Sequence, residues 1–267
     1  MVSAAVAKNI GAFQWASKEL RGKEQEVMKV VGENGLILQH ASEEMRAKEN
    51  VVKKALAQNG LALQYAHKKL QKDRDLVMQA VAQAGLALEF AGMDLRDDKQ
   101  VVLAAVGQDG HALEWAAARL RSDREVVIAA SANRGTALRY ATWRLRADRS
   151  VVIVAVKKNG LALQRASKEL QADEEVVSKA VARNAYSLRY ASAELRHNPK
   201  MIREAIRSRR KERGKKQEQK AHAAMLSLAE HQHQQHQHQQ KRKQKRKQKR
   251  KPKQHHSTSI HVRRPRG

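Results

Sequence analysis

The chain has 267 residues, and its 54 lysines and arginines outnumber 27 aspartates and glutamates, which leaves a formal net charge of +27. This charge predicts acidic partners. The absence of cysteine excludes disulfides, thiolate metal sites and cysteine nucleophiles. The sequence contains no apolar run of about 18 residues and no secretory pattern at its start, so we expect a soluble intracellular protein without a membrane partner.

A repeat of 25 residues dominates the sequence from its first residue. Eight units extend to about residue 199, and the first half of a ninth follows at Met201, Ile202, Ala205 and Ile206. Three apolar columns carry the repeat: Val2, Val27, Val52, Val77, Val102, Val127, Val152 and Val177; Ala16, Ala41, Ala66, Ala91, Ala116, Ala141, Ala166 and Ala191; and Leu20, Met45, Leu70, Leu95, Leu120, Leu145, Leu170 and Leu195.

Each unit predicts two helices, because apolar residues recur at helical spacing in both of its halves. Aspartates, and Asn198 before Pro199, stand where side chains cap the start of the first helix. These aspartates are Asp73, Asp98, Asp123, Asp148 and Asp173. Glycines stand where the first helix should end, and we expect them in the left-handed conformation. They are Gly35, Gly60, Gly85, Gly110, Gly135 and Gly160.

Helices this short are marginal alone in water, so each must bury its apolar stripe against its neighbours. The predicted fold is therefore all-α: an α/α superhelical solenoid of eight helix-pair repeats over residues 1–206. Such an array has a long groove rather than a closed pocket, which favours binding over catalysis.

The idealised unit VVxxAVxxNGLALxYAxxxLRxDRE resembles the repeats of the domain of unknown function 4116 family over about residues 1–206. The resemblance implies a helical interaction scaffold and brings no catalytic residues. Local departures are Ile10 and Ala185 in place of glycine, Lys48 in place of the capping aspartate, and Arg165 in the aromatic column.

The remaining chain predicts a helical basic extension at 207–230 and a disordered tail, rich in His and Gln and then in Lys and Arg, at 231–267. From Lys200 onward, 23 basic residues face 4 acidic ones, too dense a charge for a packed core. His231, His233, His236 and His238 could share a helix face toward a metal, but glutamine–histidine repetition dictates their spacing. We expect no metal site and no cofactor.

Basic clusters in this region are typical of nuclear import signals and of salt-sensitive binding to nucleic-acid phosphates. A merely solvated basic tail is the alternative interpretation. The clusters comprise Arg209, Arg210, Lys211, Arg213, Lys215 and Lys216, and then Lys241, Arg242, Lys243, Lys245, Arg246, Lys247, Lys249, Arg250, Lys251 and Lys253. They predict a nuclear or nucleolar location and RNA or another polyanion as a partner.

One repeat column holds six of the nine aromatic residues, and helical geometry places it at the edge of the core. Packing between repeats explains it best, although a groove for a peptide or for stacked bases is an alternative. Its members are Trp15, Tyr65, Phe90, Trp115, Tyr140 and Tyr190, with His40 and Arg165 in the other two places.

A basic column follows in the last turn of the second helix, with Gln71 and Gln171 interrupting it. Asp98, Asp123 and Asp148 follow within two residues, so we expect a solvated ladder of ion pairs, with an anion-binding stripe as the alternative. The column consists of Arg21, Arg46, Arg96, Arg121, Arg146 and Arg196.

No nucleophile elbow, P-loop, zinc-protease motif or dinucleotide fingerprint occurs, so we expect no enzyme. The leading hypothesis is a monomeric scaffold that binds another protein, with a tail for nuclear targeting or RNA binding. The alternatives are an RNA-binding repeat protein that stacks bases on the aromatic column, and a microbial effector that docks on a host protein.

Overall fold

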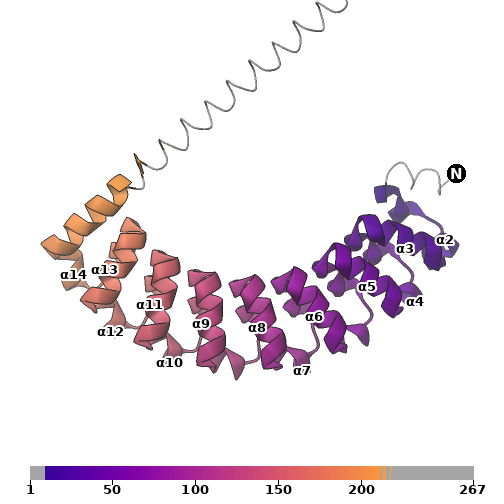
Figure 1. The fold of residues 1–267 in the computed structure, drawn as a ribbon, viewed down its shortest axis with the longest axis horizontal. Coiled ribbons are helices and arrows are strands. Elements are labelled where there is room, and N and C mark those ends of the chain that lie inside the picture. The colour runs from indigo at the N-terminus through magenta and orange to yellow at the C-terminus, as the bar shows by residue number, and fades with distance from the viewer. Residues whose placement is uncertain (1–9, 212, 215–216, 218–267) are drawn as a thin grey trace, which may run out of the picture. The chain divides into compact units, whose positions relative to one another are not determined.

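The computed structural model describes residues 10–211, 213, 214 and 217. The chain divides into two units, Met1–Arg210 and Lys211–Gly267. Within the first unit, the described residues form a curved row of repeats that contains helices and no strand (Figure 1). The predicted all-α repeat solenoid is confirmed. The first half of the first unit, residues 1–9, and most of the tail lie outside the described residues.

The first segment of each repeat is a ten-residue α-helix. These helices are α3 (Glu24–Glu33), α5 (Glu49–Gln58), α6 (Arg74–Gln83), α8 (Lys99–Gln108), α9 (Arg124–Asn133), α11 (Arg149–Lys158) and α13 (Glu174–Arg183), and residues 199–211 are helical after them. The capping aspartates are confirmed: Asp73, for example, accepts hydrogen bonds from the backbone N–H groups of Asp75 and Leu76. Asn198 likewise accepts from the N–H of Lys200.

The second segment is a six-residue 3-10 helix rather than the predicted α-helix. These are η1 (Ile10–Trp15), η2 (Gly35–His40), η3 (Gly60–Tyr65), η5 (Gly85–Phe90), η6 (Gly110–Trp115), η8 (Gly135–Tyr140), η9 (Gly160–Arg165) and η10 (Ala185–Tyr190). A 3-10 helix rises about 2.0 Å per residue against about 1.5 Å in an α-helix, so six residues return along most of the preceding α-helix. Because of this larger rise, only six residues are needed to return along most of the preceding α-helix, which fits within a repeat of 25 residues.

A short third segment closes each repeat after an extended alanine such as Ala66, whose ψ is 148°. These turns are α2 (Lys18–Gly22), α4 (Glu43–Arg46), η4 (Leu70–Lys72), α7 (Met93–Arg96), η7 (Leu120–Ser122), α10 (Trp143–Arg146), α12 (Lys168–Gln171) and α14 (Ala193–His197). Serines cap several of them, as Ser42 does by accepting from the N–H of Met45 at 3.3 Å.

The core is one continuous cluster between the α-helical layer and the 3-10 layer, from Phe13 to Met201. Each ten-residue helix packs on its neighbours and on the 3-10 helices of its own and the preceding repeat. The described members of the predicted valine column, from Val27 to Val177, are fully buried, and those of the alanine column, from Ala16 to Ala191, are buried. In the third column Leu20, Leu95 and Leu145 are only half-buried.

The prediction of left-handed glycines is wrong, because no described residue has a positive φ. These glycines lie instead where the α-helix of the next repeat approaches the backbone. A Cβ atom on Gly110 would lie 2.3 Å from the carbonyl oxygen of Ala130, and the other five of the series meet the same obstacle. Ala185 occupies this place in the last repeat and is itself only half-buried, unlike the glycines of the series. Close approach between repeats, and not turn geometry, requires the glycine column.

Candidate functional site

The aromatic column occupies the C-terminal ends of the 3-10 helices. Five of its rings, Tyr65, Phe90, Trp115, Tyr140 and Tyr190, are half-buried and pack against the core, whereas Trp15 is 80% exposed. Arginines cover two of the rings, with Arg139 Cζ 5.1 Å from the centroid of Tyr140 and Arg189 Cζ 5.3 Å from that of Tyr190. Burial raises the pKa of Tyr140, and a hydrogen bond with Glu114 adds to the rise. The column therefore borders the core as a row of partly covered rings.

The arginine column does not form the predicted ion-pair ladder. Arg96 folds back to donate from Nε to the carbonyl oxygen of Ala91 at 2.9 Å, and its Nη2 donates to that of Glu89. The Nε atoms of Arg21, Arg46, Arg121 and Arg146 are buried without a hydrogen-bond partner. The extended Ala91, which ends a 3-10 helix, leaves the carbonyl groups of Glu89 and Ala91 within reach of Arg96, so this guanidinium bonds to the backbone rather than to a carboxylate.

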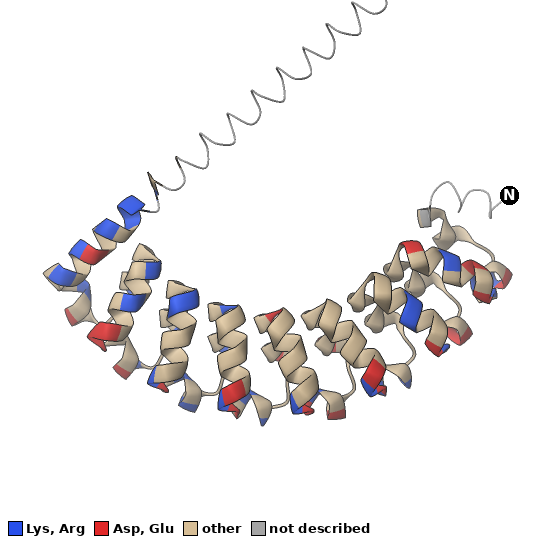
Figure 2. Ribbon diagram, in the orientation of Figure 1, with Lys and Arg blue, Asp and Glu red and all other residues tan. Residues whose placement is uncertain are grey.

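A different ladder links the N-terminal ends of the ten-residue helices. Four of the five capping aspartates, all except Asp73, pair with the basic residue 24 positions earlier. The pairs are Arg74–Asp98 (3.0 Å), Lys99–Asp123 (2.8 Å), Arg124–Asp148 (3.1 Å) and Arg149–Asp173 (3.0 Å). Charged residues of both signs accordingly follow one edge of the row (Figure 2). The ladder joins consecutive repeats and leaves these aspartates engaged.

The ladder shifts the acid–base properties of its carboxyl groups. The hydrogen bond from Lys99 lowers the pKa of Asp123. For Asp98, burial acts to raise the pKa, but hydrogen bonds from the N–H of Val101, from Arg74 and from the N–H of Gln100 together lower it. These shifts are structural, because both carboxylates already cap a helix and pair with a cation.

Lys48, the departure from the capping aspartate, belongs to a junction with reversed charges. It pairs at 2.9 Å with Glu24, which stands where α6, α8, α9 and α11 begin with Arg or Lys. The following junction would face Glu49 with Asp73, and Glu49 pairs instead with Lys53 at 2.7 Å. The junction between Glu24 and Lys48 therefore has its two charges exchanged, and the next junction, between Glu49 and Asp73, has no ion pair.

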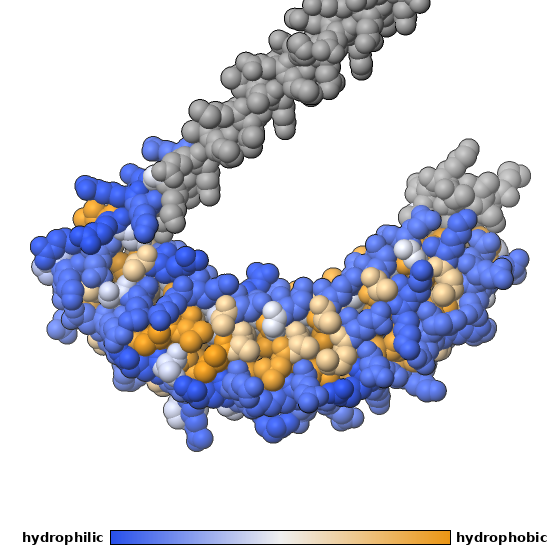
Figure 3. Space-filling view, in the orientation of Figure 1, coloured by the Kyte–Doolittle hydropathy of each residue, from blue (hydrophilic) through white to orange (hydrophobic). Residues whose placement is uncertain are grey.

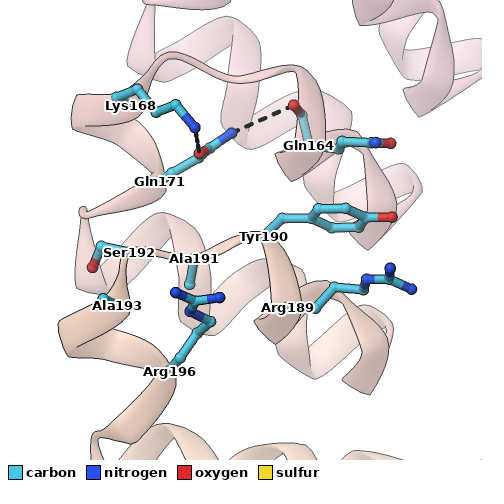
Figure 4. A pocket seen from close by; sticks show the side chains of 9 residues that line it. All are labelled: Gln164, Lys168, Gln171, Arg189, Tyr190, Ala191, Ser192, Ala193 and Arg196. Carbon is cyan, nitrogen blue, oxygen red and sulfur yellow. Dashed lines mark hydrogen bonds between the residues drawn. The ribbon is translucent and has the colours of Figure 1, made fainter.

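A hollow of about 440 Å³ lies beside Gln171, one of the two glutamines that interrupt the arginine column (Figure 4). Gln171 Nε2 donates to the carbonyl oxygens of Leu163 and Ala166, both at 3.2 Å, and its Oε1 accepts from Lys168 Nζ at 3.4 Å. The other lining residues are Gln164, Arg189, Tyr190, Ala191, Ser192, Ala193 and Arg196.

Three cations and no acid line this hollow, so it can accept an anionic group. The counterpart 100 residues earlier, beside Gln71, measures about 290 Å³ and includes Glu89 and Met93. There Arg96 is held by backbone carbonyls, whereas the guanidinium of Arg196 has no hydrogen bond or ion pair to a described residue. Both glutamines therefore border hollows, but the two hollows differ in charge.

The outward face of α6, α8, α9 and α11 carries two apolar rows that the sequence did not lead us to predict, although Lys157 and Lys158 on α11 share this face. Met78, Leu103, Ile128 and Ile153 form one row across these helices and are half-buried at the edge of the core. Smaller residues form a parallel row that comprises Ala82, Ala104, Gly107, Ala129, Ala132 and Val154. An apolar area accordingly lies over the middle of the array, bordered by hydrophilic residues (Figure 3). The signal in the sequence is α8, KQVVLAAVGQ, which is apolar on nearly all sides.

Amide side chains at the C-terminal ends of the α-helices border this face. Gln108 accepts from the N–H of Gly85 at 2.8 Å and donates to the carbonyl oxygen of Gln83 at 3.0 Å, and Asn133 bridges Gly110 and Gly107 in the same way. Lys158 occupies this column in the next repeat and lines a hollow of about 360 Å³ next to Gly135. These amides form hydrogen bonds with backbone N–H and C=O groups at the helix ends between neighbouring repeats, which would otherwise lack a partner.

The predicted basic sites lie largely beyond what the structure describes. Arg209, Arg210, Lys211 and Arg213 are helical and exposed, and Arg209 Cζ lies 5.8 Å from the ring centroid of Tyr186. Lys215, Lys216 and the basic residues of 241–253 lie outside the described residues, as do the tail histidines. Across residues 10–211, no group of acidic or histidine side chains could hold a metal ion, and no helix is long and apolar enough to cross a membrane.

Comparison with known proteins supports the repeat assignment. A family model described as "Domain of unknown function (DUF4116)" matches residues 24–71, 48–96, 73–121, 98–146, 148–196 and 173–211. Each of the first five matches spans about two repeats and begins at the cap of a ten-residue helix or one residue after it. No curated protein and no solved structure matches the chain.

Proposed function

Because this chain belongs to the DUF4116 family of helical repeats, we propose that it is a monomeric, non-enzymatic scaffold that docks another protein on its repeat array. One observation carries the proposal: an apolar row, Met78, Leu103, Ile128 and Ile153, crosses the outward face of α6, α8, α9 and α11 over four consecutive repeats. Contiguous apolar surface is costly in water and typically marks an interaction site.

The half-covered aromatic rings favour this proposal over base stacking. A stacked base needs a free ring face, whereas the column packs against the core and arginines cover Tyr140 and Tyr190. The apolar face, in contrast, has no described element of this chain over it. A protein partner would bury this surface with little rearrangement of the array.

A double substitution, Gly107→Glu with Ala132→Glu, tests the docking proposal. Both positions are exposed, and nothing lies within 4 Å of a Cβ built at Gly107, so the helices should tolerate the change. Ala118→Glu with Ala172→Glu is the matched control, at exposed positions beside the third segments η7 and α12. We expect proteins crosslinked to wild type and control to be lost from the first variant, because buried carboxylates are costly. If the wild type, the control and the Gly107→Glu with Ala132→Glu variant crosslink to the same proteins, docking on this face is refuted.

The tail supports a second part of the proposed function: nuclear import or binding of RNA or another polyanion through its basic clusters. Ten lysines and arginines between 241 and 253 would displace counterions from phosphates, so affinity should fall steeply with salt. The test is fluorescence anisotropy of labelled single-stranded RNA with the full chain and with a variant in which these ten residues are glutamine. RNA binding that survives the change, but not Trp115→Ala with Tyr140→Ala, would favour the aromatic column instead.

A nuclear location follows from the same clusters and is tested separately. A fluorescent fusion of the full chain should accumulate in the nucleus, and the ten-glutamine variant should lose that accumulation. An unchanged distribution would assign the basic residues to polyanion binding alone.

A further inference from the structure

The outward face of the ten-residue helices consists of four columns whose composition changes along the array. On α8 and α9 three of these columns hold apolar residues, of which Leu103 and Ile128 are the largest, and the fourth holds the amides Gln108 and Asn133. In the repeats before and after, lysine and arginine take their places: Lys53 and Lys54 on α5, Lys157 and Lys158 at the end of α11, and Lys179 and Arg183 on α13. From Lys53 to Arg183, these columns contain no acidic residue.

The basic residues at the two ends are largely free to meet a partner. Lys54, Lys157 and Lys158 form no ion pair with any residue of the described part of the chain. Lys53 and Lys179 pair with Glu49 and Glu175 on their own helices, where exposure keeps such pairs weak. Two cationic ends on an apolar centre complement an apolar segment with acidic ends.

The two apolar rows define the path of that segment. The row of large residues from Met78 to Ile153 runs across the helices, and a parallel strip of smaller residues lies beside it, formed by Ala82, Ala104, Gly107, Ala129, Ala132 and Val154. The amides of Gln83, Gln108 and Asn133 lie on the other side of the strip and are engaged between repeats. A chain lying on the strip therefore runs along the array, across the helix axes.

The length of the strip sets the length of the occupant. Packed helices lie about 8–10 Å apart, so four helices span about 24–30 Å. An extended chain covers about 3.3 Å per residue, which corresponds to about eight residues.

We propose that the partner docks through an extended segment in which about eight apolar residues cross α6 to α11 and acidic residues on both sides meet Lys53 and Lys54 at one end and Lys157 and Lys158 at the other. This inference rests on the proposed docking function and adds the chemistry of its partner. The acidic ends fix the register, because a shifted segment would bury an unpaired carboxylate on the apolar strip.

Synthetic peptides test the proposal on the full chain. Three fluorescent peptides share one apolar stretch of about eight residues and carry three glutamates, three glutamines or three lysines at each end. Binding is measured by anisotropy at near-physiological salt. We expect the glutamate peptide to bind about tenfold more tightly than the glutamine peptide, and the lysine peptide to bind most weakly.

Charge variants separate the docking face from the basic tail, which would also attract acidic peptides. Lys54→Gln, Lys157→Gln and Lys158→Gln together should weaken the glutamate peptide about tenfold and leave the glutamine peptide nearly unchanged. Lys18→Gln, Lys69→Gln and Lys72→Gln remove the same charge at exposed positions of the third segments and should have little effect. Equal loss in both variants would assign the charge effect to the whole molecule and overturn the inference.

The same measurements distinguish failure of the inference from failure of the docking function. If the three peptides bind equally and Gly107→Glu with Ala132→Glu weakens the glutamine peptide, docking stands but acidic ends are wrong. If that variant weakens no peptide, the face is not a docking site and both proposals fall. The variant places two carboxylates at exposed positions, and a circular dichroism melt verifies that it remains folded.

Discussion

The middle repeats and the end repeats have the same inward columns but different outward ones. Inward, the paired residues Val51 and Val52, Val101 and Val102, and Val176 and Val177 are all fully buried. Outward, one column reads Lys53, Leu103, Ile128 and Ser178 on helices of the same length. Lysine and serine serve this outward position as well as leucine, so packing does not require apolar residues there. The apolar middle therefore calls for an explanation in binding rather than in folding.

We expect the largest change in stability from substitutions at Gly107 and Gly110, which lie three residues apart in the middle of the array. Gly110→Ala should destabilise by about 3 kcal/mol, because the new Cβ would lie 2.3 Å from the carbonyl oxygen of Ala130. Gly107→Ala should stabilise by about 0.5–1 kcal/mol, because it is exposed in a helix with open space around it. Urea unfolding followed by circular dichroism measures both. Equal effects would contradict the close-approach role of the glycine column.

The junction between Glu24 and Lys48, where the charges are reversed, should give a smaller change in stability. Lys48→Asp alone should change stability little, because the gain of a helix cap is offset by repulsion from Glu24. Adding Glu24→Arg should raise the free energy of unfolding by about 1 kcal/mol, because it recreates the junction of the middle repeats. A double-mutant cycle in urea measures the coupling, and strictly additive changes would refute the ladder as a unit.

The ladder also predicts a dependence of stability on pH. The pKa of Asp123 is lowered in the folded protein, first by Lys99, and those of Asp98 and Asp148 are lowered as well. A lowered folded pKa gives stability that is present above the unfolded value of about 3.9 and lost as pH falls through the folded value. The melting temperature should therefore fall below about pH 4.

A triple variant, Asp98→Asn with Asp123→Asn and Asp148→Asn, checks the origin of this loss. It should melt lower than wild type at pH 7, and the difference should shrink as the pH falls below about 4, because wild type then loses the same charges. A difference that stays constant with pH would show that the aspartates act only as neutral caps.

We expect the smallest change in stability at the junction between Glu49 and Asp73, which has no ion pair. Glu49→Arg would place a cation opposite Asp73, in the place that Arg74 takes opposite Asp98 one repeat later. The free energy of unfolding should rise by about 0.5 kcal/mol, because exposed pairs contribute little. A loss of stability in urea would show that the existing pair between Glu49 and Lys53 matters more than the ladder.

The sequence by itself determined the repeat, its inward columns and the capping aspartates. These follow from local rules: burial repeats with the helix period, and a cap needs only a side chain beside its own helix. Asp73 and its counterparts act as predicted because their partners lie within three residues.

Only the tertiary structure decided which residues meet between repeats. Gly110 faces Ala130, Arg74 faces Asp98, and Gln108 joins Gly85 to Gln83, each across about one repeat length. The left-handed glycines and the arginine ladder were predicted wrongly because both were reasoned within one unit. The apolar outward face escaped notice because it is defined by what the neighbouring repeats leave uncovered, which depends on how the layers stack.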